Sequence, residues 1–138
     1  MNLTSIIRPV FNSRLRAIEQ YDSHAEDIQR TVLDSLLQRA ADTEWGQRYK
    51  YASIHSYEEF AATVPVNTYE ELKGYIDRMR HGERNVLWPG QVKWYAKSSG
   101  TTNDKSKFIP VSQAGLHDTH YQGGTDAVAL YLHNNPLS

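Results

Sequence analysis

The residues best suited to chemistry lie in one short segment, Lys97 to Pro110, which reads KSSGTTNDKSKFIP. Five consecutive small or hydroxyl-bearing residues stand near its start, namely Ser98, Ser99, Gly100, Thr101 and Thr102. Three lysines occur within eleven positions, and these are Lys97, Lys105 and Lys107. Backbone amides around a glycine, hydroxyl donors and ammonium groups are what a polyphosphate needs for charge-assisted hydrogen bonds. The segment therefore predicts an anion-binding loop.

This segment is not a Walker A loop. That motif, GxxxxGK[ST], needs a second glycine, which the run from Gly100 to Ser106 does not supply, and it opens a helix rather than a strand. Asn103 and Asp104 tolerate a left-handed backbone and can turn the chain where other phosphate loops place glycine. Serine, threonine and asparagine are also common in turns, so the residues alone fit a polar hairpin tip that binds nothing equally well.

The other polar clusters favour structural roles. His117 and His120 lie three positions apart on an expected helix, a spacing that suits one metal ion, but no further ligand stands at a suitable spacing. We therefore predict no metal site. The glutamate pairs at positions 58–59 and 70–71 fall at expected helix starts, where the helix dipole favours negative charge. We interpret the remaining basic cluster as a solvated helix face, and it consists of Lys73, Arg78, Arg80 and Arg84.

Helical patterns fill the chain before the loop. Apolar residues at helical spacing from Leu3 to Tyr21 predict a short helix that Pro9 should end or kink. A hydroxyl residue followed three positions later by glutamate indicates a capping box. Three such pairs precede helical stripes, and their capping residues are Ser23, Ser56 and Thr68. The helix after Thr68 should end near Gly82, so the first half of the chain is predicted to be mostly helical.

Strand patterns surround the loop itself. From Val92 to Lys97 apolar and polar residues alternate, which predicts a half-buried strand with Val92, Trp94 and Ala96 on its inner face. A second apolar run, Phe108 to Val111, follows the loop. The simplest arrangement is a strand-loop-strand hairpin that presents Ser98 to Lys107 at its tip.

A final helix is expected after the hairpin. Ser112 can cap it, and the asparagines before Pro136 can stop it. The residues expected to share one face are Leu116, His120, Gly123, Ala127 and either Leu130 or Tyr131. The fold class predicted from these patterns is α+β, with a mostly helical N-terminal half, a phosphate-loop hairpin and a C-terminal helix.

Composition limits the remaining function classes. The 138 residues fit a single unit, and a formal charge of −1 provides no long-range attraction to nucleic acid or anionic lipid. The absence of cysteine excludes disulfides, thiol catalysis and thiolate metal sites. No stretch approaches the roughly 20 apolar residues of a transmembrane helix. We therefore expect a cytoplasmic protein that binds neither nucleic acid nor membrane.

Taken as a whole, the segment WYAKSSGTTNDKSKFIPVS resembles the first ATP-binding motif of the adenylate-forming enzymes. Its form is similar to that of the auxin-responsive-promoter family of acyl-acid amido synthetases. The preceding stretch also looks like that family's approach to the motif, including VPV, the helix start YEEL and the segment IDRM. The resemblance runs from about Ala40 to Val111.

The resemblance implies a reaction and its participants. In that family the loop holds the phosphates of ATP, normally with Mg²⁺, while a carboxylate attacks the α-phosphate, and an amino acid amine then captures the acyl adenylate. The motif positions assigned to phosphate contact are Ser98, Ser99, Gly100, Thr101 and Thr102, with Lys107 as the basic position before Pro110. No catalytic residue is assigned. The implied partners are a small carboxylic acid and an amino acid.

Members of that family are several times longer than this chain. We therefore expect residues 1–138 to form a single unit that is the N-terminal fragment of a larger adenylate-forming catalytic domain. Such a fragment should lack amide-forming turnover, bind nucleotide weakly at best, and self-associate through exposed apolar surface. Two alternatives remain open: another adenylate-forming enzyme, such as an acyl-CoA ligase, and a non-catalytic helical interaction module.

Overall fold

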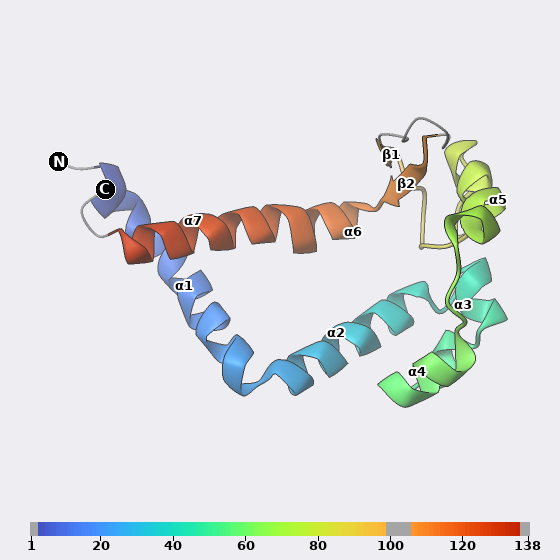
Figure 1. Cartoon of the computed structure of the whole chain (residues 1–138), viewed down its shortest axis with the longest axis horizontal. Coiled ribbons are helices and arrows are strands. Elements are labelled where there is room, and N and C mark those ends of the chain that lie inside the picture. The colour runs from blue at the N-terminus through green and yellow to red at the C-terminus, as the bar shows by residue number, and fades with distance from the viewer. Residues whose placement is uncertain (1–2, 99–105, 136–138) are drawn as a thin grey trace. The chain divides into compact units, whose positions relative to one another are not determined.

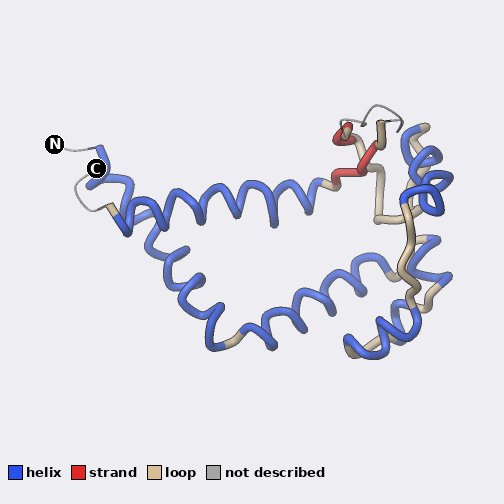
Figure 2. The backbone as a smooth tube through the Cα atoms, in the orientation of Figure 1, coloured by secondary structure: helices blue, strands red, loops and turns tan. Residues whose placement is uncertain are grey.

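A computed structural model describes residues 3–98 and 106–135 of the chain. Helices make up most of this part, and two short strands pair with each other (Figure 2). The chain divides into two compact units, one made of Met1–Ile28 with Ala114–Ser138 and the other of Gln29–Gln113. The expected α+β class, with helices first, then a hairpin and then a C-terminal helix, is confirmed (Figure 1).

The first unit begins with helix α1, Leu3–Ser23, which corrects two predictions. The helix is not short and Pro9 does not end it, because Pro9 lies inside its 21 residues. Ser23 is the last residue of α1 rather than the cap of the next helix, α2, which covers Ala25–Ala40. His24 takes that position, since its carbonyl accepts the amide of Ile28 at 3.0 Å.

Helix α7 (Gln122–Asn134) packs against α1 within the same unit. It follows the short helix α6 (Gln113–Gly115) and a π-helical segment η2 (Leu116–Tyr121). Arg14 of α1 forms a two-bond ion pair with Asp126 of α7, with Nε to Oδ1 at 2.7 Å and Nη2 to Oδ2 at 3.1 Å. Ala129 and Leu132 are the buried apolar residues of α7.

The face predicted for this final helix is wrong. Leu130 and Tyr131, expected on the inner face, are 41% and 58% exposed, whereas Ala129 is fully buried. The prediction assumed an unbroken α-helical period. The π-helical turns of η2 hold more residues per turn, so every later residue is rotated around the helix axis relative to that period.

The second unit contains the remaining helices and the hairpin. Its elements after α2 are α3 (Glu44–Arg48), η1 (Tyr51–Ser53), α4 (Tyr57–Thr63), α5 (Tyr69–Arg80), β1 (Trp94–Lys97) and β2 (Phe108–Val111). Ser56 caps α4 as predicted, accepting the amide of Glu59 at 3.1 Å. Thr68 caps α5 in a reciprocal capping box with Glu71. These two hydroxyl residues therefore fix where the helices begin.

The end of α5 also follows the prediction. Gly82 has φ +94, a left-handed conformation that favours glycine, and its amide donates to Met79 O at 3.0 Å. The amide of Glu83 donates to Arg78 O at 3.1 Å, which completes a Schellman motif. Glycine at this position therefore lets the chain reverse directly after α5.

The reversed chain then runs back to α3. The first amides of α3, those of Glu44 and Trp45, donate to the carbonyls of Asn85 and Val86 at 2.8 and 3.0 Å. Val86 is 1% exposed and forms a small core with the buried side chains of Met79 and Val92. The segment after α5 thus satisfies the start of α3 and supplies the core between them.

Strand β1 presents a different face from the one predicted. Val92 is buried as expected, but Trp94 is 49% exposed, Ala96 is exposed, and Tyr95 packs against the core. The predicted alternation began at Val92, which precedes the paired strand. Its burial therefore does not determine which face of β1 turns inward, and the large Tyr95 ring covers the core instead.

Gly46 provides a stability test of this unit. A Cβ atom at Gly46 would lie 2.0 Å from the carbonyl oxygen of Ala40, so we expect Gly46→Ala to lower the free energy of unfolding by about 3 kcal/mol or more. Gly74, inside α5, has nothing within 4 Å of the same position. We expect the matched variant Gly74→Ala to raise stability by about 0.5–1 kcal/mol. Urea unfolding measures both, and equal effects would contradict the packing described.

Candidate functional site

The hairpin brings the two arms of the candidate loop together. β1 and β2 are antiparallel, with Lys97 opposite Phe108. One position closer to the loop, the Ser98 amide donates to Lys107 O at 3.0 Å, and the Lys107 amide donates to Ser98 Oγ at 3.1 Å. Ser98 and Lys107 therefore form the closed base of the loop, and the strand-loop-strand arrangement predicted around them is confirmed.

Four of the predicted site residues lie outside the described part of the chain. These are Ser99, Gly100, Thr101 and Thr102, and Lys105 also falls there. Of the six positions assigned to phosphate contact, the structure places Ser98, which is exposed, and Lys107, which is half-buried. The structure therefore describes the base of the candidate loop, at Ser98 and Lys107.

Tyr69, the first residue of α5, contacts the second arm of the hairpin. Its hydroxyl accepts the amide of Phe108 at 3.0 Å. The amide of Phe108, which faces Lys97 in the strand pair, is therefore bonded to α5. The ring of Tyr69 also lies beside Lys107, with 5.6 Å from Nζ to the ring centroid.

Arg80 holds the same arm from the other end of α5. Its guanidinium lies 3.8 Å from the centroid of the Phe108 ring, and it also pairs with Asp77 at 3.2 Å. The first residue of β2 is therefore held twice, through its backbone amide by Tyr69 and through its ring by Arg80. Sequence reasoning missed both contacts, because nothing local to either segment indicates a partner so distant along the chain.

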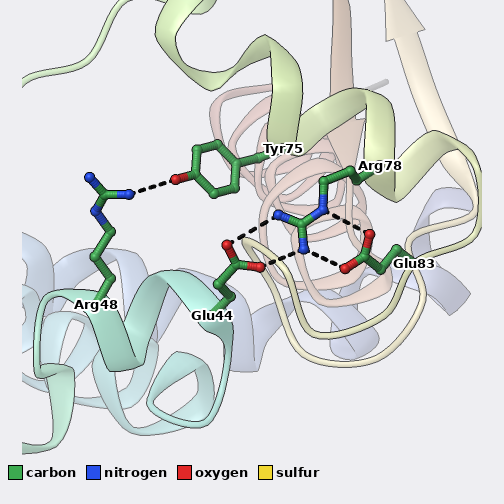
Figure 3. A network of polar contacts seen from close by, with 5 residues as sticks. All are labelled: Glu44, Arg48, Tyr75, Arg78 and Glu83. Carbon is green, nitrogen blue, oxygen red and sulfur yellow. Dashed lines mark hydrogen bonds and ion pairs between the residues drawn. The ribbon is translucent and has the colours of Figure 1, made fainter.

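Arg78 is the centre of a polar network on α5, shown in Figure 3. It donates two hydrogen bonds to Glu44 of α3, at 2.6 and 3.1 Å, and two to Glu83, of which that from Nε is 2.8 Å long. Arg48 of α3 donates to the Tyr75 hydroxyl at 2.7 Å. The side chains of Arg78 and Arg80 are 40% and 36% exposed, as expected for a solvated face, and in addition Arg78 pairs with Glu44 of α3 and Arg80 contacts the Phe108 ring.

The network shifts the ionisation of its carboxylates. Hydrogen bonds from Arg78 lower the pKa of Glu44 and of Glu83 below their ordinary value. A hydrogen bond from the Thr68 amide likewise lowers the pKa of Glu71 in the capping box of α5. Both ends of α5 are thus stabilised by ionised glutamates.

The histidines show no metal-binding geometry. No group of three potential ligands occurs among the described residues. His117 contacts its neighbour Asp118 at 3.2 Å, and His120 lies against the Tyr121 ring. Within the same described part, no helix has the length and apolar character required to cross a bilayer.

The described residues form an α+β fold in which capped helices support a hairpin. The loop of this hairpin is rich in serine, threonine and lysine. The chain matches the model of the GH3 family N-terminal domain over residues 14–136, and it belongs to the GH3 family. The resemblance to acyl-acid amido synthetases noted from the sequence is thereby confirmed.

Individual relatives carry the names of amido synthetases, which are ligases. Indole-3-acetic acid-amido synthetase GH3.6 of Arabidopsis thaliana is 32% identical over 105 residues, covering 75% of this chain and 17% of the relative. GH3.15 of the same plant, also named an indole-3-acetic acid-amido synthetase, is 30% identical over 125 residues, covering 90% and 21%. A putative enzyme of that name from Oryza sativa subsp. japonica, GH3.10, is 34% identical over 99 residues. The chain thus spans about a fifth of the length of such relatives.

Arg78 can be tested through the pH dependence of stability. Glutamates with lowered pKa values contribute stability fully above their ordinary value near 4.5, and this contribution is lost as the pH falls through the lowered values. We expect Arg78→Met to be less stable than the wild type at pH 7, with a gap that narrows as the pH falls below the ordinary glutamate value of 4.5. Thermal unfolding at a series of pH values from 7 downward measures the gap. The exposed Arg84→Met is the matched control and should show no such trend.

Proposed function

We propose that this chain supplies the ATP phosphate-binding loop of an ATP-dependent ligase that adenylates a carboxylic acid and transfers the acyl group to an amino acid amine. Membership of the GH3 family and the names of the relatives support the reaction class. The observation that carries the assignment of the loop is its closed base, where Ser98 and Lys107 exchange two hydrogen bonds.

The charge of Lys107 suits this role. Among the described residues, no carboxylate forms an ion pair with Lys107, and its ammonium faces the Tyr69 ring instead. A ring face attracts a cation without neutralising it. Lys107 is therefore available to pair with an anion, unlike Arg78, which is already paired with two carboxylates.

The remaining loop residues match the requirements of a bound triphosphate. Ser98, Ser99, Thr101 and Thr102 bring hydroxyl donors, and Gly100 allows backbone amides to approach closely. Magnesium bound to ATP would supply further neutralisation of the phosphate oxygens. The loop needs no acid or base for this purpose, because phosphoryl and nucleotidyl transfer depend mainly on position and charge.

The reaction follows from these assignments. The substrate carboxylate oxygen attacks the α-phosphorus of ATP, the bond to the bridging oxygen breaks, and pyrophosphate leaves with the bonding electrons. The loop cations and donors stabilise the charge that develops on pyrophosphate. The amine of the amino acid then attacks the acyl carbon, AMP leaves and the amine loses a proton. The acyl acid named for the Arabidopsis relatives is indole-3-acetic acid, and a carboxylic acid is the substrate class proposed for this protein.

A nucleotide titration tests the loop. We expect Mg-ATP to cause saturable shifts of the Ser98 and Lys107 amide resonances, with binding about tenfold weaker in Lys107→Met, as for loss of one charged hydrogen bond. Ser99→Ala and Thr101→Ala should weaken binding less. Lys93, exposed on the approach to β1, provides the matched control Lys93→Met, which should bind like the wild type.

Two outcomes would contradict the proposal. Absence of saturable binding to the wild-type chain, in a titration extended to the weak affinity expected of this fragment, would support a hairpin that binds nothing. Equal weakening by Lys107→Met and Lys93→Met would show that the attraction is a general effect of positive charge rather than recognition by this loop.

A further inference from the structure

Tyr69 touches two successive residues of the second hairpin arm in two different ways. Its hydroxyl accepts the amide of Phe108 at 3.0 Å, and its ring lies 5.6 Å from the Nζ of Lys107. One contact fixes the backbone directly after Lys107, and the other attracts the end of the Lys107 side chain. A single residue of α5 thus restrains both ends of the candidate phosphate-binding lysine.

The position of Tyr69 is itself well determined. Tyr69 follows Thr68, whose amide donates to Glu71 Oε2 at 2.6 Å and whose hydroxyl accepts the Glu71 amide at 3.4 Å. This capping box fixes the first turn of α5. Tyr69 is half-buried, so its side chain has less freedom than an exposed tyrosine at a helix start.

A lysine needs such a restraint to act at a defined point. Its four-carbon chain samples many rotamers, and ordering it for one contact costs free energy. A ring beside the ammonium limits this sampling before the anion arrives and leaves the charge intact. Restraint by the Tyr69 ring therefore reduces the conformational entropy that the Lys107 side chain loses when phosphate binds.

We propose that Tyr69 is a positioning residue for the phosphate site, which holds Lys107 in place through its ring and through the Phe108 amide. This inference rests on the proposed function of the loop. It adds a residue that precedes the loop by 29 positions, as counted from Tyr69 to Ser98, and that lies outside the motif itself.

A double-mutant cycle with Mg-ATP tests whether Tyr69 acts through Lys107. We expect Tyr69→Leu to weaken Mg-ATP binding about fivefold, from the combined loss of the ring contact and the hydrogen bond. In the Lys107→Met background the same change should have little further effect, because the group that Tyr69 positions is gone. A purely structural role would instead weaken binding by the same factor in both backgrounds.

Two further variants separate the contributions and guard against misfolding. Tyr57 is the first residue of α4, follows the capping residue Ser56 and is 69% exposed, so Tyr57→Leu is the matched control and should bind like the wild type. Tyr69→Phe keeps the ring and loses the hydroxyl. It should bind Mg-ATP more tightly than Tyr69→Leu.

The outcomes distinguish this inference from the proposed function. If the wild-type chain binds no Mg-ATP, the proposed function fails and this inference fails with it. If the wild type binds and Tyr69→Leu binds equally well, or if its effect is fully additive with that of Lys107→Met, the inference alone is overturned. Should Tyr69→Leu not fold, Tyr69→Phe takes its place in the cycle, and weakening of Mg-ATP binding by the same factor in the wild-type and Lys107→Met backgrounds decides against the inference.

Discussion

The placement of the candidate site depends on the attachment of the hairpin to helix α5. Two strands of four residues do not form a stable structure in water by themselves, so an external contact must hold them. Phe108 receives that contact twice, through its amide from Tyr69 and through its ring from Arg80. Once β2 is held, the register of the hairpin determines that Ser98 and Lys107 meet at the base of the loop.

Helix α5 can serve as a support because it is itself fixed at both ends. The capping box at Thr68 sets its first turn, and the Schellman motif at Gly82 ends it and sends the chain back toward α3. Arg78 joins α5 to Glu44 of α3, and Met79 buries its side chain in the core beside Val86. The charge of Arg78 thus stabilises the fold by pairing with carboxylates. Among the described residues, the Lys107 ammonium faces only the Tyr69 ring, which leaves it able to contact an anion.

Much of this arrangement could be predicted from local sequence, and its decisive contacts could not. Caps such as Thr68 and the alternation around the hairpin are short-range patterns, since a side chain bonds an amide a few residues away. The bond from Phe108 to Tyr69 joins residues 39 positions apart, and neither sequence neighbourhood indicates it. The face of α7 was mispredicted because the π-helical segment η2 changes the helical period, and the inner face of β1 because Val92 precedes the strand.

Amide hydrogen exchange at Phe108 in the wild-type chain tests the attachment of the hairpin most directly. This amide donates to the Tyr69 hydroxyl, so its protection depends on the contact with α5. The described structure predicts slow exchange at Phe108, comparable with that of Ser98, whose amide closes the hairpin. Exchange at Phe108 as fast as in an unstructured peptide, with Ser98 still protected, would show a hairpin that forms without α5 and would contradict the account.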